Sequence, residues 1–292
     1  MTLDLNDYRG RVLVTDGAWG TQLQQRGLPA GSCPELWNVE HPQAVKDVAR
    51  AYIVAGSDII LTNTFGANGP VLARHGAADR LAELAEAGVA LSRRAAGSDV
   101  LVFASMGPTG RMLMIEEHAA DELYSSFATA ARAFADGGAD AVVIETMTEP
   151  AEAALAARAV RDTTDLPIVA SLTYGSGPDG MATMMGAHPA DVLSALDGLD
   201  VGAFGANCGV GPEAYIKVIR RYRELTDAPL WVKANAGLPV MRNGTSVFPL
   251  GPDAYAAFVP ALIAAGATFI GGCCGTGPDH IAAIRKAVDD AG

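Results

Sequence analysis

The chain has 292 residues, half of them apolar, and its 33 acidic against 21 basic side chains give a net charge of −12 and a pI near 4.8. This charge excludes the basic surface that binding to nucleic acid or to an anionic membrane requires. No apolar run reaches the roughly 18 residues of a membrane span, and the N-terminus lacks the basic and apolar parts of a signal peptide. The 4 cysteines are too few for a disulfide scaffold. We therefore expect one cytoplasmic domain, residues 1–292, whose thiols are free.

Short apolar runs alternate with amphipathic stretches along the whole chain. The runs predict eight strands, at Val12–Asp16, Asp58–Thr62, Val100–Ser105, Ala141–Glu145, Ile168–Thr173, Val201–Asn207, Leu230–Asn235 and Thr268–Cys273. The stretches between them predict helices, most clearly at Gln43–Ala55, Asp121–Asp136, Glu152–Arg161, Glu213–Leu225 and Asp279–Asp289. Proline is favoured in the first turn of a helix, and six prolines fall at such places: Pro42, Pro150, Pro189, Pro212, Pro252 and Pro278.

A weak internal repeat indicates that one unit is used several times. Ala55–Ile60 resembles Gly137–Val142 and Ala265–Ile270, and in each a helix is expected to end at glycine just before a strand. Eight alternating units in this length predict an α/β fold, a single-domain (β/α)8 TIM barrel, with an open doubly wound sheet as the alternative. The longest stretch without a clear helical pattern, Gly20–His41, is expected to form a lid or wall on the catalytic face.

Polar residues end seven of the eight expected strands. In a barrel these ends converge on one face, where the chemistry lies. The ends are Asp16-Gly17, Thr62-Asn63-Thr64-Phe65, Ser105-Met106, Glu145-Thr146, Asn207-Cys208, Asn235-Ala236 and Cys273-Cys274. We expect Asn63, Ser105, Asn207 and Asn235 to belong to a substrate site there.

Three cysteines stand at two of these strand ends. Cys208 ends the sixth strand, and Cys273 and Cys274 end the eighth, two places away around a barrel. Two adjacent residues of a regular strand point to opposite faces, so we expect a bend at Gly271, Gly272 and Gly275 to bring both thiols inward. The pattern predicts a zinc site of three thiolates with one open position, which is typical of a catalytic metal. The alternative is three small buried apolar residues.

The other candidate ligands fit less well. Cys33 lies in a loop without such a setting, and the five histidines, His41, His75, His118, His188 and His280, fall in loops or at helix starts. Zinc with three thiolates is a poor Lewis acid for splitting water. It can instead hold a fourth, exogenous thiol as the thiolate, because coordination deprotonates a thiol outright. Alkyl transfer to sulfur is the chemistry that this favours.

Two carboxylates stand at strand ends near the thiols. Burial of an unpaired carboxylate is costly, so Asp16 and Glu145 either bind a substrate ammonium or pair with a structural cation such as Lys233 or Arg111. A helix is expected at Thr21–Arg26, and the backbone N–H groups of Gly17, Ala18 and Trp19 just before it could receive a substrate carboxylate. Together these groups describe an amino-acid site beside a thiol-activating zinc.

The quoted motifs resemble those of the zinc- and homocysteine-dependent S-methyltransferases along nearly the whole chain. The resemblance rests on Asp16–Thr21, Thr62–Phe65, Gly107–Gly110, Ile144–Thr146, Asn207-Cys208, Asn235–Pro239 and Gly271–Thr276. It implies a (β/α)8 barrel with zinc on Cys208, Cys273 and Cys274 and with the thiolate of homocysteine in the fourth place. It also implies that Asp16 and Glu145 bind the amino group, that backbone at Gly17–Trp19 receives the carboxylate, and that Asn235 approaches the metal when substrate is absent.

Within this family the chain is most similar to the homocysteine-binding module of cobalamin-dependent methionine synthases, which share Asn-Ala-Gly-Leu-Pro and Gly-Gly-Cys-Cys-Gly-Thr. S-methylmethionine-using relatives tend to carry Arg where Gly275 stands. We therefore expect methionine to be made from homocysteine with a methylcorrinoid (methylcobalamin type) that a separate protein carries. The alternatives are a small methyl-onium donor (S-methylmethionine, betaine or dimethylsulfoniopropionate), another thiol acceptor in a catabolic corrinoid system, or a non-catalytic zinc-stabilised binding module.

The expected partner would need a docking surface at the catalytic mouth. Met106, Met112, Met114 and the loop Tyr174–Met185, which includes Met184, follow the third and fifth strands. Methionine adapts its shape readily at binding surfaces. We expect these residues to form the rim on which a corrinoid protein docks, with ordinary packing as the alternative.

Overall fold

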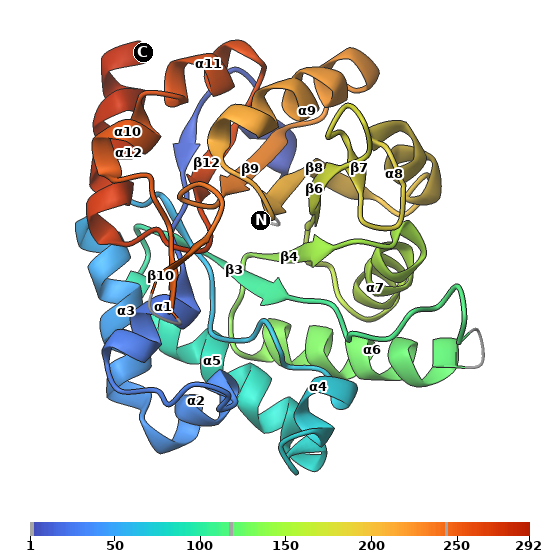
Figure 1. Ribbon diagram of the computed structural model, residues 1–292. Helices are drawn as coiled ribbons and strands as arrows, with labels where there is room; N and C mark the ends of the chain where they lie inside the picture. The colour runs from blue at the N-terminus through green and yellow to red at the C-terminus, as the bar shows by residue number, and fades with distance from the viewer. Residues whose placement is uncertain (1–2, 117–118, 243–244) are drawn as a thin grey trace.

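A computed structural model describes residues 3–116, 119–242 and 245–292, and it shows eight parallel strands around an axis with helices outside (Figure 1). The strands are β1 (Leu13–Val14), β2 (Ile59–Ile60), β3 (Leu101–Met106), β4 (Ala141–Met147), β5 (Ile168–Leu172), β8 (Val201–Cys208), β9 (Leu230–Ala234) and β12 (Phe269–Gly272). Their order is β1-β12-β9-β8-β5-β4-β3-β2. All eight predicted strands are confirmed, and the order is that of a TIM barrel rather than of an open doubly wound sheet.

Side chains close the ring between β1 and β2, where no regular ladder forms. The N–H of Asp58 donates to Val14 O at 2.8 Å, and the N–H of Val14 donates to Asp58 Oδ2 at 2.7 Å. Higher up, the N–H of Leu61 donates to Asp16 Oδ2 at 2.7 Å. Two carboxylates thus replace the missing backbone acceptors, so the barrel is nearly closed.

The weak sequence repeat has a physical basis. Asp58, Asp140 and Thr268 occupy the same place in the three similar segments, and each donates its backbone N–H to the carbonyl of the preceding strand, at 2.8 Å in all three cases. The side chain of each also accepts the N–H of that same residue, which is Val14, Val102 or Leu230. The glycine two residues earlier has positive φ in every case, as a helix end requires.

The barrel interior is apolar in its lower and middle part. Its core contains Leu13, Ile59, Phe103, Val143, Val169, Trp231 and Phe269, among others. The rings of Phe103, Trp231 and Phe269 pack on one another with centroids 5.6 to 6.5 Å apart. A short 3-10 helix, η1 (Leu5–Tyr8), covers the end at which the strands begin, and its Leu5 is buried in the same core. The opposite end is therefore the one left for a site.

The helices lie around the strands, and the longer ones are amphipathic. They are α1 (Trp19–Gln25), α2 (Trp37–Glu40), α3 (Pro42–Val54), α4 (Gly69–Ala73), α5 (Leu81–Ala96), α6 (Ala120–Asp136), α7 (Pro150–Thr163), α8 (Pro189–Ala195), α9 (Pro212–Leu225), α10 (Pro252–Ala256), α11 (Val259–Ala264) and α12 (Pro278–Ala291), with short 3-10 helices η2 (Pro34–Leu36) and η3 (Ala78–Arg80). Each of the six predicted prolines is the first residue of its helix. Among the described helices, none has the length and apolarity needed to cross a membrane.

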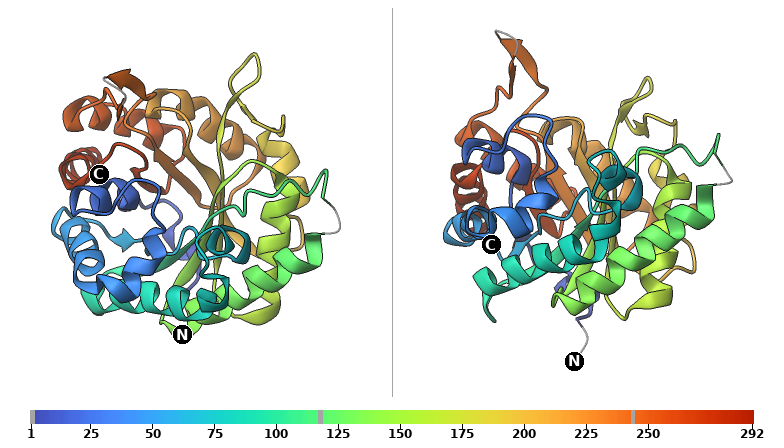
Figure 2. Two further views of the ribbon diagram at one scale, coloured as in Figure 1. Left: turned by 60° about the horizontal axis from the view of Figure 1, so that its bottom comes forward. Right: turned by 90° about the horizontal axis from the view of Figure 1, so that it is seen from below.

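The segments at the carboxyl ends of the strands differ from the prediction in three ways. The stretch Gly20–His41 contains more helix than the expected one at Thr21–Arg26, which α1 confirms, because all of η2 and all of α2 also lie in it. Its short helices carry too few turns to show a periodic pattern. The predicted loop Tyr174–Met185 contains a hairpin, β6 (Tyr174–Ser176) with β7 (Ala182–Thr183), and a second hairpin joins β10 (Val240–Arg242) to β11 (Thr245–Val247). Both hairpins project from the end of the barrel away from the N-terminus (Figure 2).

The third difference concerns Met106, which was expected on the docking rim. Met106 is the last residue of β3 and only 2% exposed, so it belongs to the core. Its position alternates with that of the inward-facing Ser105, and the side chain therefore packs under the surrounding helices. Met112, Met114 and Met184 are exposed.

The closure of the barrel by Asp58 is testable. Asp58→Ala removes the acceptor of the Val14 N–H and one partner of Arg285, and we expect a loss of about 1–3 kcal/mol in the free energy of unfolding. Asp289→Ala removes only the exposed partner of the same arginine, and should cost no more than about 0.5 kcal/mol. Urea unfolding measures both variants, and equal losses would contradict a role for Asp58 in closing the barrel.

Candidate metal and substrate site

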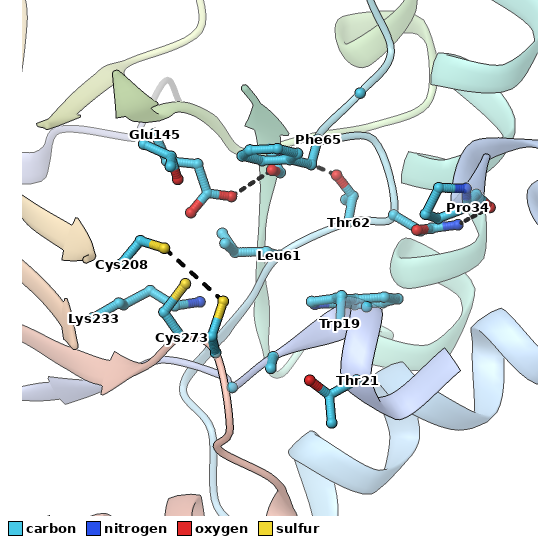
Figure 3. A pocket seen from close by; sticks show the side chains of 18 of the residues that line it. Trp19, Thr21, Pro34, Leu61, Thr62, Phe65, Glu145, Cys208, Lys233 and Cys273 are labelled. Carbon is cyan, nitrogen blue, oxygen red and sulfur yellow. Dashed lines mark hydrogen bonds between the residues drawn. The ribbon is translucent and has the colours of Figure 1, made fainter. Parts of the chain in front are cut away.

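A cavity of about 320 Å³ opens at the carboxyl ends of the strands. Trp19 and Phe65 lie on one side of it and Cys208 and Cys273 on the other (Figure 3), and Leu61 and Cys274 also belong to its lining. Pro34 and Glu35 of η2 also belong to its lining. The stretch Gly20–His41 thus contributes to the wall of the site, as predicted.

The three thiols converge although they come from two strands. Their sulfur atoms all lie within 4.8 Å of one another, and Cys208 Sγ is 3.9 Å from Cys274 Sγ. A tetrahedral zinc with Zn–S bonds of about 2.3 Å would hold its sulfur atoms about 3.8 Å apart. Within the described chain this group of possible ligands contains no histidine, aspartate or glutamate; His118 lies outside the described residues. The donor set therefore fits an ion that keeps one position open.

The backbone at Cys208 bends to present its thiol. Cys208 ends β8 with φ of 63°, in the left-handed region that non-glycine residues seldom occupy. Tyr215 of α9 donates its hydroxyl to Asn207 O at 2.9 Å and to Cys208 O at 2.8 Å. This buried hydroxyl therefore fixes the two carbonyls around the bend.

The pair Cys273-Cys274 lies in a turn just after β12. The strand continues through Gly271 and Gly272, so the expected bend at these two glycines is wrong. No side chain fits at Gly271, because a Cβ there would lie 1.9 Å from Thr15 Oγ1. The turn is closed by Thr276, whose N–H and hydroxyl both donate to Cys273 O, and Gly275 supplies it with a positive φ of 82°.

Groups around the thiols bias their protonation. Hydrogen bonds from Cys273 and then Cys274 lower the pKa of Cys208, and a hydrogen bond from Asn235 adds to this effect. Hydrogen bonds with Cys208 and then Cys274, together with burial, raise the pKa of Cys273 well above its usual value. Each thiol thus disfavours the ionisation of its neighbours, and a cation would be needed to hold all three as thiolates. Asn235 also accepts the Cys274 N–H at 3.0 Å.

Cys33 has no place in this cluster. Its thiol donates to Glu35 Oε2 at 3.2 Å, and burial followed by the charge of Glu35 raises its pKa to about 12. Glu35 Oε1 in turn accepts the Gly66 N–H at 2.6 Å. The pair therefore ties the wall segment to the loop after β2.

A buried ion pair lies beside the cavity. Lys233 donates to Asp16 Oδ1, and both side chains are almost wholly buried. Asp16 Oδ2 accepts from Leu61 N and from Trp19 Nε1, each at 2.7 Å. The sequence left two partners open for Asp16, a substrate ammonium or a structural cation. The structure pairs Asp16 with a structural cation, Lys233. Arg111, the other candidate cation, pairs with Glu116 instead.

Glu145 is the carboxylate that reaches the cavity. Ser105 donates its hydroxyl to Glu145 Oε1, and the amide of Asn207 lies 3.4 Å from Oε2. Burial raises the pKa of Glu145, while the charge of Lys233 opposes that rise. Asn207 also receives the N–H of Thr146 at 2.8 Å and donates to its hydroxyl at 2.7 Å, which holds Thr146 at φ of 64°. The last residues of β4 and β8 are thereby locked together.

The structure divides the predicted site residues into two groups. Gly17, Ala18, Trp19, Asn63, Ser105, Glu145 and the three cysteines line the cavity. Asp16, Asn207 and Asn235 are not among the described residues of the lining; they hydrogen-bond to residues that are. Asn63 donates to Pro34 O and Asn38 Oδ1, so its amide anchors the wall segment.

Lys233 was not predicted as a site residue, although its position in the expected strand indicates that it faces the inside of the barrel. Lys233 is the one charged residue of Leu230–Asn235, and it stands two positions after the inward-facing Trp231. A period of two places it on the inner face. The tyrosines that support the site gave no such signal. Tyr52, Tyr215 and Tyr255 lie on the outer helices α3, α9 and α10, and each donates its hydroxyl to a carbonyl beneath the site.

Comparison with known proteins agrees with this geometry. The family model described as Homocysteine S-methyltransferase matches residues 13–288. Methionine synthase of Mycobacterium tuberculosis (strain ATCC 25618 / H37Rv) is 34% identical over 95% of this chain, and that of Mycobacterium leprae (strain TN) is 33% identical over the same share. The chain spans about a quarter of the length of these relatives, 25% and 24%.

Solved structures show the same fold. The metallated form of the homocysteine methyltransferase MmuM from Escherichia coli has a TM-score of 0.78 with 26% identity, covering 94% of this chain and 96% of that one. This chain resembles a methyltransferase from Methanosarcina mazei in fold alone. The TM-score is 0.62 and the identity 14%, and the match covers 96% of this chain and 94% of that one. Because the family model covers almost the whole barrel, the chain belongs to the homocysteine S-methyltransferase family of enzymes.

Proposed function

We propose that this barrel, residues 1–292, binds homocysteine and methylates its sulfur to give methionine, with zinc held by Cys208, Cys273 and Cys274. The observation that carries the proposal is the convergence of three thiols on one side of a cavity large enough for an amino acid. The absence of a fourth ligand among the described residues supports a catalytic over a structural metal, since structural zinc sites are closed. Bound there, zinc would keep the acceptor sulfur as a nucleophilic thiolate at neutral pH.

The residues of this chain would orient the acceptor. Glu145 faces the cavity, and it is the carboxylate that we assign to the amino group of homocysteine, with Ser105 and Asn207 fixing its orientation. A ligand ammonium would favour the charged form of Glu145, which burial disfavours. The backbone N–H groups of Gly17 and Trp19 would receive the acceptor carboxylate, since that of Ala18 donates to Thr276 O at 3.3 Å. Asp16 would not touch the acceptor but would position Trp19 and Lys233.

We further propose that the methyl donor is a methylcorrinoid on a separate protein. The support is a rim of exposed apolar side chains on the loops that follow β3, β7 and β9: Met112, Met114, Ile115, Met184, Leu238, Val240 and Met241. Large exposed apolar groups at a cavity mouth are typical of a docking surface. The similarity to methionine synthases, of which this chain spans about a quarter, points in the same direction.

Gly275 argues against S-methylmethionine as the donor. Its φ is 82°, and an added Cβ would lie 2.3 Å from Cγ of Phe248. The arginine that S-methylmethionine-using relatives tend to carry here therefore does not fit without displacing that ring. One feature supports a methyl-onium donor as the second candidate: Trp19 and Phe65 line the cavity, and aromatic faces bind onium cations.

The metal assignment predicts the behaviour of single cysteine variants. Cys208→Ser, Cys273→Ser and Cys274→Ser should each lower zinc content from about one ion per chain toward zero after dialysis against a weak chelator and abolish methylation, because two thiolates hold the ion less tightly. Cys33→Ser is the matched control and should keep both. Metal analysis and circular dichroism check that the fold persists. Full zinc content and activity in any of the three variants would refute the assignment.

The donor assignment predicts a difference between carriers. Zinc-loaded enzyme and homocysteine are assayed with a methylated corrinoid protein, free methylcobalamin, S-methylmethionine, betaine and dimethylsulfoniopropionate. Turnover should be fast with the protein-bound donor and at least about ten-fold slower with free methylcobalamin, because docking contributes binding energy near the reacting centre. Met114→Lys and Met184→Lys should slow only the protein-bound donor. Efficient turnover with an onium compound alone would exclude the carrier and leave the metal assignment intact.

A further inference from the structure

Lys233 stands inside the site at a place where a substrate cation was expected. It lies on β9 opposite Asn207 of β8 and Gly271 of β12, it is 2% exposed, and it belongs to the lining of the cavity. Its Nζ lies 5.9 Å from the ring centroid of Trp231, which packs below it. Figure 3 shows the Lys233 side chain extending beside Cys273 toward the middle of the cavity. A buried ammonium at this position contributes more than packing only if it contacts negatively charged groups of the protein or of a ligand.

Asp16 is already satisfied by groups of this chain. Lys233 donates to Oδ1, while Leu61 N and Trp19 Nε1 both donate to Oδ2 at 2.7 Å. Asp16 itself is not exposed at all. An acceptor ammonium would have to displace Lys233 to form a direct ion pair with this carboxylate. Displacement would leave the lysine buried without a partner, which is strongly unfavourable.

The ammonium of Lys233 has more N–H groups than the described residues accept. A lysine carries three N–H groups, and among the described residues it donates only to Asp16. Since the side chain lines the cavity, the remaining donors are available to a ligand there. Two carboxylates line the cavity among the described residues: Glu35 accepts from Cys33 and from the Gly66 N–H, whereas Glu145 has Ser105 on one oxygen and a long contact to Asn207 on the other. The cavity therefore offers one open carboxylate and one open ammonium.

We propose that Lys233 is a specificity-determining residue: it takes the place of an acceptor ammonium on Asp16 and presents its free N–H groups to the acid group of the acceptor thiol. The acid group would lie between Lys233 and the backbone at Gly17–Trp19, next to Asp16 in sequence. The site then depends more on the carboxylate of the acceptor thiol than on its amino group, for which Glu145 is the carboxylate that remains. This inference rests on the proposed function, because it assumes a thiol acceptor at the three cysteines.

Three acceptor thiols of matched length separate the two recognition modes. Homocysteine has both groups, 4-mercaptobutyrate lacks the amino group, and 3-mercaptopropylamine lacks the carboxylate. Calorimetry on the zinc-loaded wild-type protein should show that losing the amino group raises Kd by less than about ten-fold, while losing the carboxylate raises it at least about 100-fold. The reverse order would overturn the proposal. If no thiol binds in a zinc-dependent way, the proposed function fails, and this inference fails with it.

Lys233→Met removes the charge and keeps the length of the side chain. In this variant Asp16 is free to accept an ammonium, so the ratio of Kd for 4-mercaptobutyrate to Kd for homocysteine should rise at least about ten-fold. Lys286→Met, an exposed lysine of α12, is the matched control and should leave the ratio unchanged. An equal change for all three thiols would show a purely structural role and contradict the proposal. If the variant does not fold, the order of the three thiols on the wild-type protein still decides.

Discussion

The site depends on a polar layer that lies directly on an apolar layer inside the barrel. Two residues beyond the apolar Phe103, Val143, Val169 and Trp231 stand Ser105, Glu145, Ser171 and Lys233. The step of two along each strand keeps both sets on the inner face. The lower layer excludes water from below, so every polar group of the upper layer needs a partner within the protein or in a ligand.

That need explains the arrangement of charges. Ser171 and Thr146 bond to Asn207, Asn207 reaches Glu145, and Lys233 bonds to Asp16. Removing one member of such a buried network costs about 1–3 kcal/mol or more, because it leaves a partner unsatisfied. Glu145 lines the cavity, and among the described residues its carboxylate has only the hydroxyl of Ser105 and the amide of Asn207, at 3.4 Å, as hydrogen-bond partners. An incoming ligand can therefore complete the network at that point.

The segments that carry the three converging thiols are held from outside the barrel. Tyr215 of α9 and Tyr255 of α10 donate their buried hydroxyls to carbonyls at Cys208 and Gly271, and Tyr52 of α3 does the same at Ala18. Burial raises the pKa of each of these tyrosines, so they remain neutral donors. The helices thus determine where the ends of the strands lie, and a thiol cluster can be preformed before any ion binds.

Much of the fold could be predicted from the sequence, because the strands, the proline-led helices and the clustering of strand-end residues follow from local patterns. The convergence of Cys208 with Cys273 and Cys274 also followed, from strand order alone. The bend at Cys208 could not be predicted, since a left-handed φ at a cysteine has no local signature in the sequence, and the hydroxyl of Tyr215 that bonds to the carbonyls there is placed only once α9 has packed. The partner of Asp16 could not be predicted either. Pairing with a structural cation and binding of a substrate ammonium both require a carboxylate at the end of a buried strand, so the sequence does not distinguish them. Pairing with Lys233 is a matter of three-dimensional distance.

The central claim is that three thiols build an open metal position which binds an acceptor thiol as its thiolate. Calorimetric titration with homocysteine at pH 7, in buffers of different ionisation enthalpy, tests it most directly. A free thiol has a pKa of about 8.5, so zinc-loaded protein should release close to one proton per homocysteine bound, at about one site per chain. Zinc-free protein should bind far more weakly. Binding without dependence on the buffer, or equally tight binding to the zinc-free protein, would contradict the account.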